Sequence, residues 1–144
     1  GGAYGGGASY QSLNGTFSFY SYRDPNLKST VSAFRSAAKT LANGDFTRQH
    51  IREAKLEIIQ KLDCPISPGL RGLTTFAWER EGLDLNTRQS YRHRLLNCSE
   101  DEIAKAMKDI ILPQIEEGAL VSFAGQELLE REGSKLKGFE IGKI

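Results

Sequence analysis

The first 22 residues carry the pattern of two β-strands joined by a turn. Glycine dominates the beginning of the chain, and residues 16–22 then alternate, with Phe17 and Phe19 on the opposite side of an extended segment from Tyr20. Asn14-Gly15 separates the two segments and is typical of a tight turn. The pattern therefore predicts a β-hairpin in which the first strand is unusually poor in side chains.

Six helices are expected after the hairpin. Apolar residues recur at spacings of three and four along most of this part of the chain, which is the signature of a helix with one apolar face. In the second helix this stripe consists of Ile51, Ala54, Ile58 and Leu62. The expected helices cover about 27–42, 47–62, 67–80, 87–96, 99–112 and 125–132.

Capping residues set the expected ends of these helices. Asn43-Gly44 is a typical C-terminal stop for the first helix, Asp45 or Thr47 caps the second, and Asn86 caps the fourth. The sequence 99–102, Ser-Glu-Asp-Glu, is a capping box that opens the fifth helix, and Pro113 ends or kinks that helix.

Two further strands are expected near the end of the chain. Residues 120–124 form a short apolar run, and residues 139–144 alternate between apolar and polar side chains. The order of elements predicts an α+β fold, in which an antiparallel-rich sheet is covered on one face by a layer of helices. The length of 144 residues is that of a single domain.

The glycine run at residues 1–7 admits three interpretations. A phosphate-binding loop should open directly into a helix, often with a lysine, but the first lysine here is Lys28 and a second strand intervenes. A frayed chain terminus is the second interpretation. The third is a strand that another backbone or a ligand approaches closely, because Gly5, Gly6 and Gly7 leave its surface bare while Tyr4 projects from it.

Composition narrows the classes of function. The chain has 19 Lys and Arg residues against 18 Asp and Glu residues, a net charge of +1, and 39% hydrophobic residues. Such a balance is typical of an ordinary globular domain and disfavours nucleic acid as a partner. Arg88, Arg92, His93 and Arg94 form a local basic cluster, which we leave unassigned because such runs are usually solvated.

No residues of the chain form a recognisable metal or redox motif. Cys64 and Cys98 are isolated and are expected to be reduced thiols. His50 and Glu53 lack a second histidine at helical spacing, so His50 is expected to be a surface residue. No apolar run is long enough to cross a membrane. We therefore expect a location in a reducing compartment, either the cytoplasm or an organelle matrix.

Several motifs resemble one known family over nearly the whole chain. They are Gly-Gly-Ala-Tyr-Gly-Gly at residues 1–6, Phe-Ser-Phe-Tyr-Ser-Tyr-Arg-Asp-Pro-Asn at 17–26, Ser-Pro-Gly at 67–69, Glu-Gly-Leu at 81–83 and Val-Ser-Phe-Ala-Gly at 121–125. Together they resemble the last domain of the presequence proteases, which belong to the pitrilysin and insulinase superfamily of zinc metallopeptidases. The first motif is the most specific.

The resemblance implies a zinc-dependent endopeptidase that degrades unfolded peptides inside a chamber of four related domains. In such enzymes an inverted H-x-x-E-H motif in the first domain holds the zinc, and none of those residues occurs here. The resemblance implies that Tyr4 contacts the reacting carbonyl, that Gly5, Gly6 and Gly7 bind the extended substrate, and that the arginine partner of Tyr4 precedes Gly1. The alternative is a non-catalytic peptide-binding or scaffold subunit of the same fold.

The resemblance also implies that residues 1–144 are the C-terminal part of the last domain of a longer peptidase and begin in the middle of that domain. The expected partners are peptide substrates and the remaining domains of the same chain, with no nucleic acid and no membrane. Zinc is expected in the longer protein and not on this chain. Because this chain has no zinc ligand set, it is expected to be inactive when taken alone. An unpaired strand edge and an uncovered apolar face predict that it self-associates.

Overall fold

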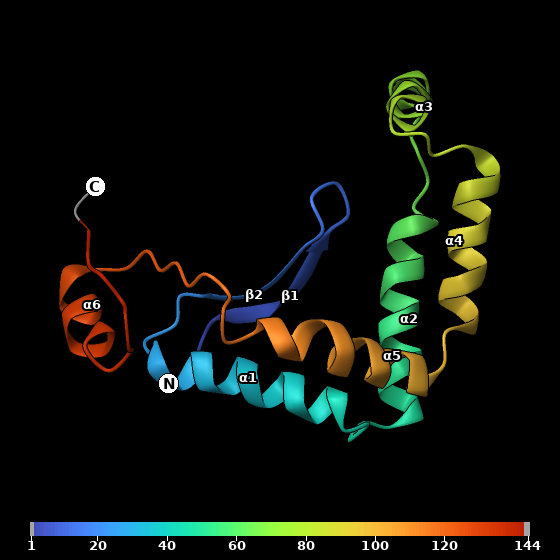
Figure 1. The fold of residues 1–144 in the computed structure, drawn as a ribbon. Coiled ribbons are helices and arrows are strands. Elements are labelled where there is room, and N and C mark those ends of the chain that lie inside the picture. The colour runs from blue at the N-terminus through green and yellow to red at the C-terminus, as the bar shows by residue number, and fades with distance from the viewer. Residues whose placement is uncertain (1, 143–144) are drawn as a thin grey trace. The chain divides into compact units, whose positions relative to one another are not determined.

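The structure is a computed structural model, and it describes residues 2–142. These residues fall into two compact units, one made of residues 2–43 and 105–142 and the other of residues 44–104. Figure 1 shows the order of the elements along the chain. The expected α+β class is confirmed, with a two-stranded antiparallel sheet and six α-helices in the described part of the chain.

The hairpin and α1 form the first part of unit 1. Strands β1 (Gly5–Gln11) and β2 (Thr16–Tyr22) pair antiparallel in a register that places Gly5 opposite Tyr22. Phe19, on β2, stacks on Phe34 of α1 (Lys28–Ala42), with ring centroids 5.2 Å apart. The alternation of residues 16–22 therefore has the expected effect, because one side of β2 packs on α1 while Tyr20 and Tyr22 remain exposed.

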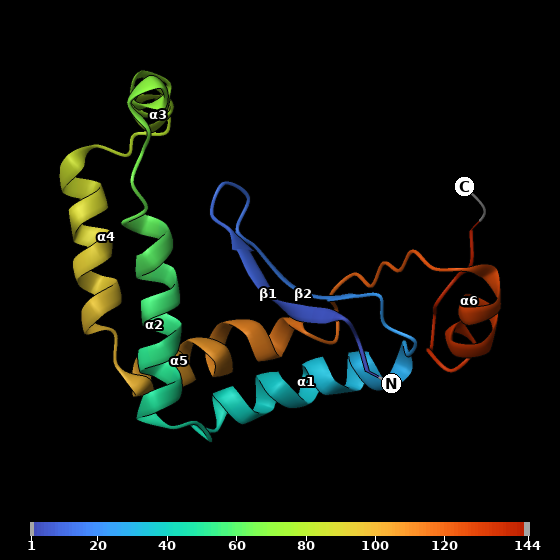
Figure 2. The same cartoon turned by 180° about the vertical axis from the view of Figure 1, so that it is seen from behind.

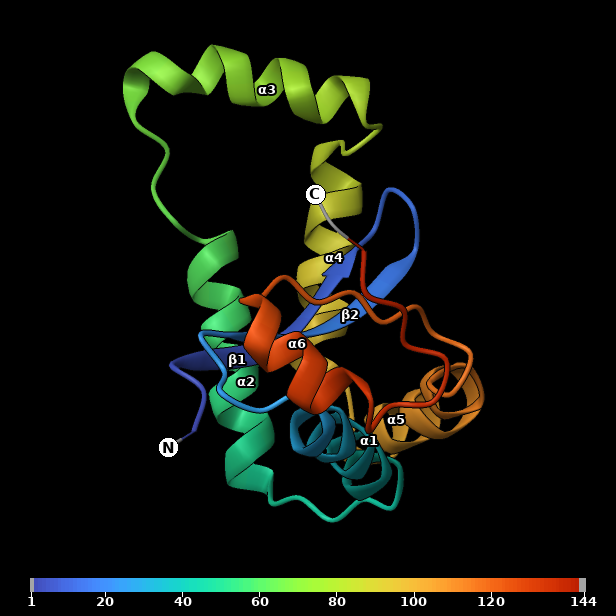
Figure 3. The same ribbon diagram turned by 90° about the vertical axis from the view of Figure 1, so that its left-hand side faces the viewer.

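The rest of unit 1 comes from the C-terminal third of the chain. Figure 2 shows α1 lying beside the helical segment formed by the π-helix η2 (Met107–Ile111) and the 3₁₀ turn η3 (Leu112–Gln114). Ala38 and Met107 are the buried apolar side chains of this packing. Helix α6 (Gln126–Gly133) lies beside the start of α1 (Figure 3), where Arg131 donates to the carbonyl oxygen of Pro25 at 3.1 Å.

Unit 2 is helical. Helices α2 (Arg48–Leu62) and α4 (Leu85–Asn97) lie side by side, and a 3₁₀ turn, η1 (Pro68–Leu70), leads into α3 (Arg71–Arg80) between them in sequence (Figure 1). Figure 3 shows α3 running across the direction of α4. Helix α5 (Glu100–Ala106) begins in this unit.

Most of the expected helix ends are confirmed by hydrogen bonds. Helix α1 ends at Ala42, directly before Asn43-Gly44, and the Thr47 hydroxyl accepts from the N–H of His50 at the start of α2. At α5, the N–H of Glu102 donates to the Ser99 hydroxyl at 3.1 Å and the N–H of Ser99 donates to the Glu102 carboxylate at 2.7 Å. These reciprocal bonds form the predicted capping box.

Three expectations about the fold are wrong. Helix α4 is capped by Asp84, whose carboxylate accepts from the N–H of Thr87 at 2.7 Å, and not by Asn86. Residues 120–124 and 139–142 form no strand, and residues 143–144 of the last expected strand lie outside the described residues. A strand forms only where it pairs with a neighbouring strand, and neither of these segments pairs with the hairpin.

The apolar stripe expected on α2 is also only partly right. Ile51 is half-buried as expected, but Ile58 and Leu62 are exposed. The half-buried positions of this helix are instead Ile51, Lys55 and Ile59. The face of α2 that carries these three half-buried residues is the one that packs on α4, because the ammonium group of Lys55 reaches the end of α4.

Candidate functional site

The candidate site lies where the chain enters the hairpin. Tyr4 directly precedes β1, and its backbone N–H donates to the carbonyl oxygen of Tyr22 at 3.0 Å. This hydrogen bond anchors the backbone of Tyr4 to the end of β2, while its side chain remains 79% exposed. The phenol of Tyr4 is thus presented to solvent next to the glycines of β1.

A small cluster of aromatic and cationic side chains surrounds Tyr4. Its ring meets the ring of Tyr22 edge-on, with centroids 6.1 Å apart and planes at 79°. The guanidinium carbon of Arg23 lies 5.8 Å from the centroid of Tyr4 and 5.4 Å from that of Tyr22. Sequence reasoning assigned no role to Arg23, although it lies within the motif at residues 17–26.

The three candidate glycines differ in what surrounds them. A methyl group added at Gly5 would meet open space. One added at Gly6 would approach the carbonyl oxygen of Tyr20 to 3.2 Å, and one added at Gly7 would approach the Tyr20 hydroxyl to 3.0 Å. Gly7 therefore accommodates the side chain of Tyr20, which lies across it, whereas Gly5 leaves the surface next to Tyr4 bare.

Asp24 organises the turn between β2 and α1. Its Oδ2 accepts from the hydroxyls of Ser21 at 2.6 Å and Thr30 at 2.5 Å, and its Oδ1 accepts from the backbone N–H of Asn26 at 2.9 Å. Partial burial alone would raise the pKa of Asp24, but these hydrogen bonds outweigh it and hold the pKa below its ordinary value of 3.8. The carboxylate form thus stabilises this turn.

Acidification is expected to loosen this turn. Because the pKa of Asp24 is lower in the folded protein than in the unfolded chain, its contribution is complete above about pH 4 and is lost as the pH falls through the folded-state value. The protection of the Asn26 amide against hydrogen exchange should therefore fall as the pH is lowered below about 4. In Asp24→Asn the protection should be low at every pH, and Asp45→Asn is the matched control. Protection in wild type that stays constant as the pH is lowered would contradict the assignment.

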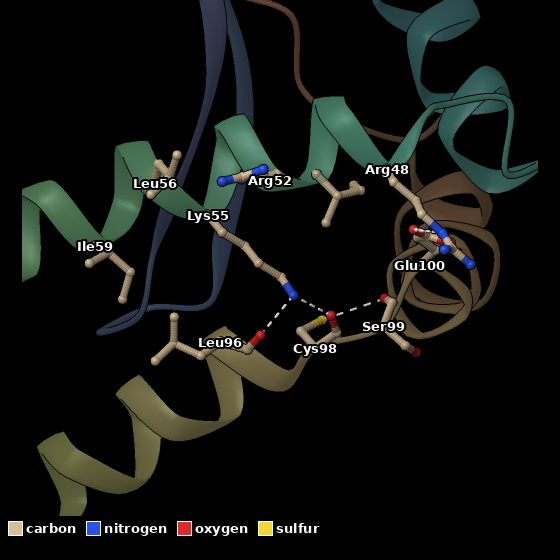
Figure 4. Close-up of a pocket in the computed structure, with 10 residues that line it drawn as sticks. Arg48, Arg52, Lys55, Leu56, Ile59, Leu96, Cys98, Ser99 and Glu100 are labelled. Atoms are coloured by element: carbon tan, nitrogen blue, oxygen red, sulfur yellow. Dashed lines mark hydrogen bonds and ion pairs between the residues drawn. The ribbon is translucent and has the colours of Figure 1, made fainter.

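Unit 2 contains a groove between α2 and the end of α4 (Figure 4). Its floor is apolar, and Arg48, Arg52 and Lys55 carry positive charge along the α2 side. The ammonium group of Lys55 donates to the carbonyl oxygens of Leu96 at 2.9 Å and Cys98 at 2.6 Å. Lys55 therefore stabilises the C-terminus of α4, where backbone carbonyls lack helical partners.

His50 takes part in the cap of a helix, and Cys64 and Cys98 form no disulfide. The Nδ1 atom of His50 accepts from the backbone N–H of Thr47 at 3.3 Å, which completes a capping box at the start of α2, and His50 is exposed as expected. Cys64 and Cys98 are free thiols. Within residues 2–142, no group of three or more His, Cys, Asp or Glu side chains could hold a metal ion.

Residues of the basic cluster at 88–94 are engaged within unit 2. The guanidinium of Arg92 makes a bidentate pair with Asp63, with N–O distances of 2.7 and 3.1 Å. Hydrogen bonding to Arg92 lowers the pKa of Asp63. Arg88 lies over the ring of Trp78 at 3.7 Å. The two arginines therefore join helices of unit 2, in keeping with a structural role.

Large apolar side chains remain exposed over much of the described surface. Ala38 and Met107 are the buried hydrophobic residues in the part of the chain that the structure describes. Val121 and Phe123, which belong to the apolar run that was expected to form a strand, are 72% and 82% exposed. No helix in residues 2–142 is both long and apolar enough to cross a membrane. Self-association of this chain stays a prediction, which the exposed apolar surface continues to support.

Comparison with known proteins gives a match to one family. The model of the family described as "PreP C-terminal domain" matches residues 1–124 of this chain. The match includes the hairpin, unit 2 and the expected strand at 120–124.

Individual relatives carry one common name. The chain is similar to proteins named "Presequence protease, mitochondrial" from Yarrowia lipolytica, Xenopus tropicalis and Mus musculus. The identities are 38% over 112 residues, 42% over 106 residues and 35% over 136 residues, which cover 78%, 74% and 94% of this chain. The matched regions amount to 11%, 10% and 12% of the lengths of these relatives. The chain therefore spans about a tenth of the length of the curated relatives that it matches.

Proposed function

Because this chain belongs to the PreP C-terminal domain family, we propose that it is the C-terminal part of a longer zinc-dependent endopeptidase, which we call the parent, and that it lines the chamber in which the parent cuts unfolded peptides. Membership of the family supports a peptidase-related role. The names of the relatives also contain the word mitochondrial, which supports a location of the parent in an organelle matrix.

Tyr4 is the residue of this chain that takes part in the reaction. Its backbone is anchored to β2 and its side chain is exposed, so the phenol hydroxyl can reach a bound peptide. A hydroxyl donor placed at the reacting carbonyl stabilises the negative charge that develops on the carbonyl oxygen. The exposed phenol beside the open strand is the observation that carries this assignment.

The glycines of β1 provide room for the substrate backbone. An extended peptide adds to an open strand edge through main-chain hydrogen bonds, and a strand without side chains leaves space for the side chains of the peptide. Gly5 fits this role best, because open space surrounds the position of its absent side chain. Gly6 follows Gly5 along β1, whereas the side chain of Tyr20 already lies across Gly7, so Gly7 fits this role least.

The residues that the structure describes do not fit a zinc site. The described part has no suitable group of His, Cys, Asp or Glu side chains. In the proposal the zinc of the parent is therefore held elsewhere, and this chain contributes substrate contacts only. The residues assigned here bind the peptide or donate a hydrogen bond to it.

The proposal predicts that residues 1–144, purified alone, neither bind zinc stoichiometrically nor cleave an unfolded peptide. Metal analysis and a hydrolysis assay on the same preparation test both statements. One zinc ion per chain, or cleavage by a chelator-free preparation of this chain alone, would refute the proposal that the zinc is held outside this chain and that this chain supplies only substrate contacts. If the parent also fails to cleave peptides but still binds them, the alternative of a non-catalytic peptide-binding subunit is correct.

A further inference from the structure

Arg23 has an unusual backbone conformation. Its φ angle is +50°, and it is the one non-glycine residue with positive φ among residues 2–142. In this left-handed region the Cβ atom crowds the backbone, so the region favours glycine, asparagine and aspartate and disfavours arginine. Such conformations persist where the surrounding structure holds them in place, and they are concentrated at functional sites.

The surrounding hydrogen bonds hold the backbone of Arg23 in place from both sides. Before it, Tyr22 accepts from the N–H of Tyr4, and the Ser21 hydroxyl donates to Asp24. After it, Asp24 also accepts from Asn26 and from Thr30 on α1. The corner between the hairpin and α1 is thus fixed at both ends, and this sets the direction of the Cα–Cβ bond of Arg23.

The guanidinium of Arg23 lies against Tyr4 and Tyr22. The guanidinium carbon and the ring centroids of Tyr4 and Tyr22 form a triangle with sides of 5.4, 5.8 and 6.1 Å. Both cation-to-ring distances are within the range of a cation–π interaction. The neighbouring carboxylate, Asp24, is occupied by the hydroxyls of Ser21 and Thr30 and by the N–H of Asn26.

We propose that Arg23 is a positioning residue, whose guanidinium holds the Tyr4 ring against Tyr22 so that the Tyr4 hydroxyl stays at the open end of β1. The inference rests on the proposed function of Tyr4 and adds to it the group that orients this side chain. An exposed tyrosine ring otherwise exchanges between rotamers, and each rotamer places the hydroxyl at a different point. A donor contributes to turnover only in the fraction of molecules in which it is aligned.

Kinetics of the parent separate positioning from direct substrate binding. Arg23→Ala and Arg23→Gly should each lower kcat by about two- to fivefold and leave KM unchanged, since a cation–π contact at an exposed site contributes little more than that. Arg23→Gly removes the guanidinium without backbone strain, so an equal loss in both variants assigns the effect to the guanidinium. Arg23→Lys keeps the cation and should recover most of kcat.

A double variant tests whether Arg23 acts through Tyr4. In a Tyr4→Phe background, Arg23→Ala should lower kcat no further, because the hydroxyl that it orients is already absent. An equal loss in both backgrounds, or a rise in KM alone, would overturn the inference and assign Arg23 to contact with the substrate.

A spectroscopic readout decides the matter independently of catalysis. 3-Fluorotyrosine is placed in the parent at the residue numbered Tyr4 here. Arg23→Ala should then shift and narrow the fluorine resonance as the ring gains freedom, and Arg23→Lys should shift it less. The same label at Tyr10, which lies at the other end of β1, should not respond. An unchanged resonance at position 4 would overturn the inference. If Tyr4→Phe retains normal turnover, the proposed role of Tyr4 falls, while this resonance still shows whether Arg23 holds the ring.

Discussion

Tyr4→Phe in the parent lowers the turnover number by about 10²–10³-fold, which corresponds to about 2.7–4 kcal/mol of transition-state stabilisation, and leaves KM nearly unchanged. The substitution removes one hydroxyl and keeps the ring that contacts Tyr22. The loss falls on kcat because the donor acts on charge that develops during the reaction, while the rest of the chamber still binds the peptide. Steady-state kinetics with an unfolded peptide provide the measurement.

Tyr10→Phe is the matched control for this variant. Tyr10 lies on β1, the strand that Tyr4 precedes, is 65% exposed, and loses the same atom. It should have the kinetic constants of the wild type. A normal kcat together with a raised KM in Tyr4→Phe would instead assign Tyr4 to ordinary substrate binding.

Gly5→Val in the parent raises KM by roughly tenfold with a smaller effect on kcat. A Cβ atom added at Gly5 lies more than 4 Å from every heavy atom of the chain other than those of Gly5 and its two chain neighbours, so the hairpin should keep its structure. The branched side chain nevertheless occupies the bare surface on which the extended peptide is expected to lie. Losing one or two main-chain hydrogen bonds costs about 1–2 kcal/mol, which is about a tenfold change in binding.

Ser9→Val controls for the introduction of a β-branched side chain into β1. Ser9 is four residues further along the same strand and faces the same side of the hairpin as Gly5. Its kinetic constants should be those of the wild type, and peptide affinity should be measured with both variants. If Gly5→Val has the KM of the wild type, the peptide does not bind at this end of the hairpin.

The helices could be predicted because their ends are specified by local chemistry. The capping box at Ser99 and Glu102 needs only residues three apart, and the stop at Asn43-Gly44 needs only a glycine that accepts positive φ. The wrong cap on α4 shows the limit of this reasoning. Asp84 and Asn86 are both good caps, and the sequence does not decide between two candidates two residues apart.

The strands were harder to predict because pairing is not local. The hairpin carries its own partner through the turn at Asn14-Gly15, so its two strands form. The segment 120–124 has the composition of a buried strand, yet Val121 and Phe123 are exposed and unpaired within the described residues. Composition indicates that a segment suits a sheet, but it does not supply the neighbouring edge.

The candidate site was predictable only in part. Tyr4 and the glycines stood out by composition and by resemblance, and the structure describes where they lie without testing their roles. Arg23 could not be found, because its significance comes from a backbone angle and from two rings that are brought together by the register of β1 and β2. Likewise, the pairing of Arg92 with Asp63 joins residues 29 positions apart, and no pattern of spacing reveals it.

The most direct test of the account is the turnover number of the parent truncated immediately before Gly1, measured with an unfolded peptide. We expect the truncated protein to keep its zinc, because the ligands are expected outside residues 1–144, and to lose peptide cleavage, because the substrate contacts of the hairpin are gone. Zinc content measured on the same preparation shows that the metal site is intact. Cleavage at the rate of the full-length parent would contradict the claim that this chain completes the active site.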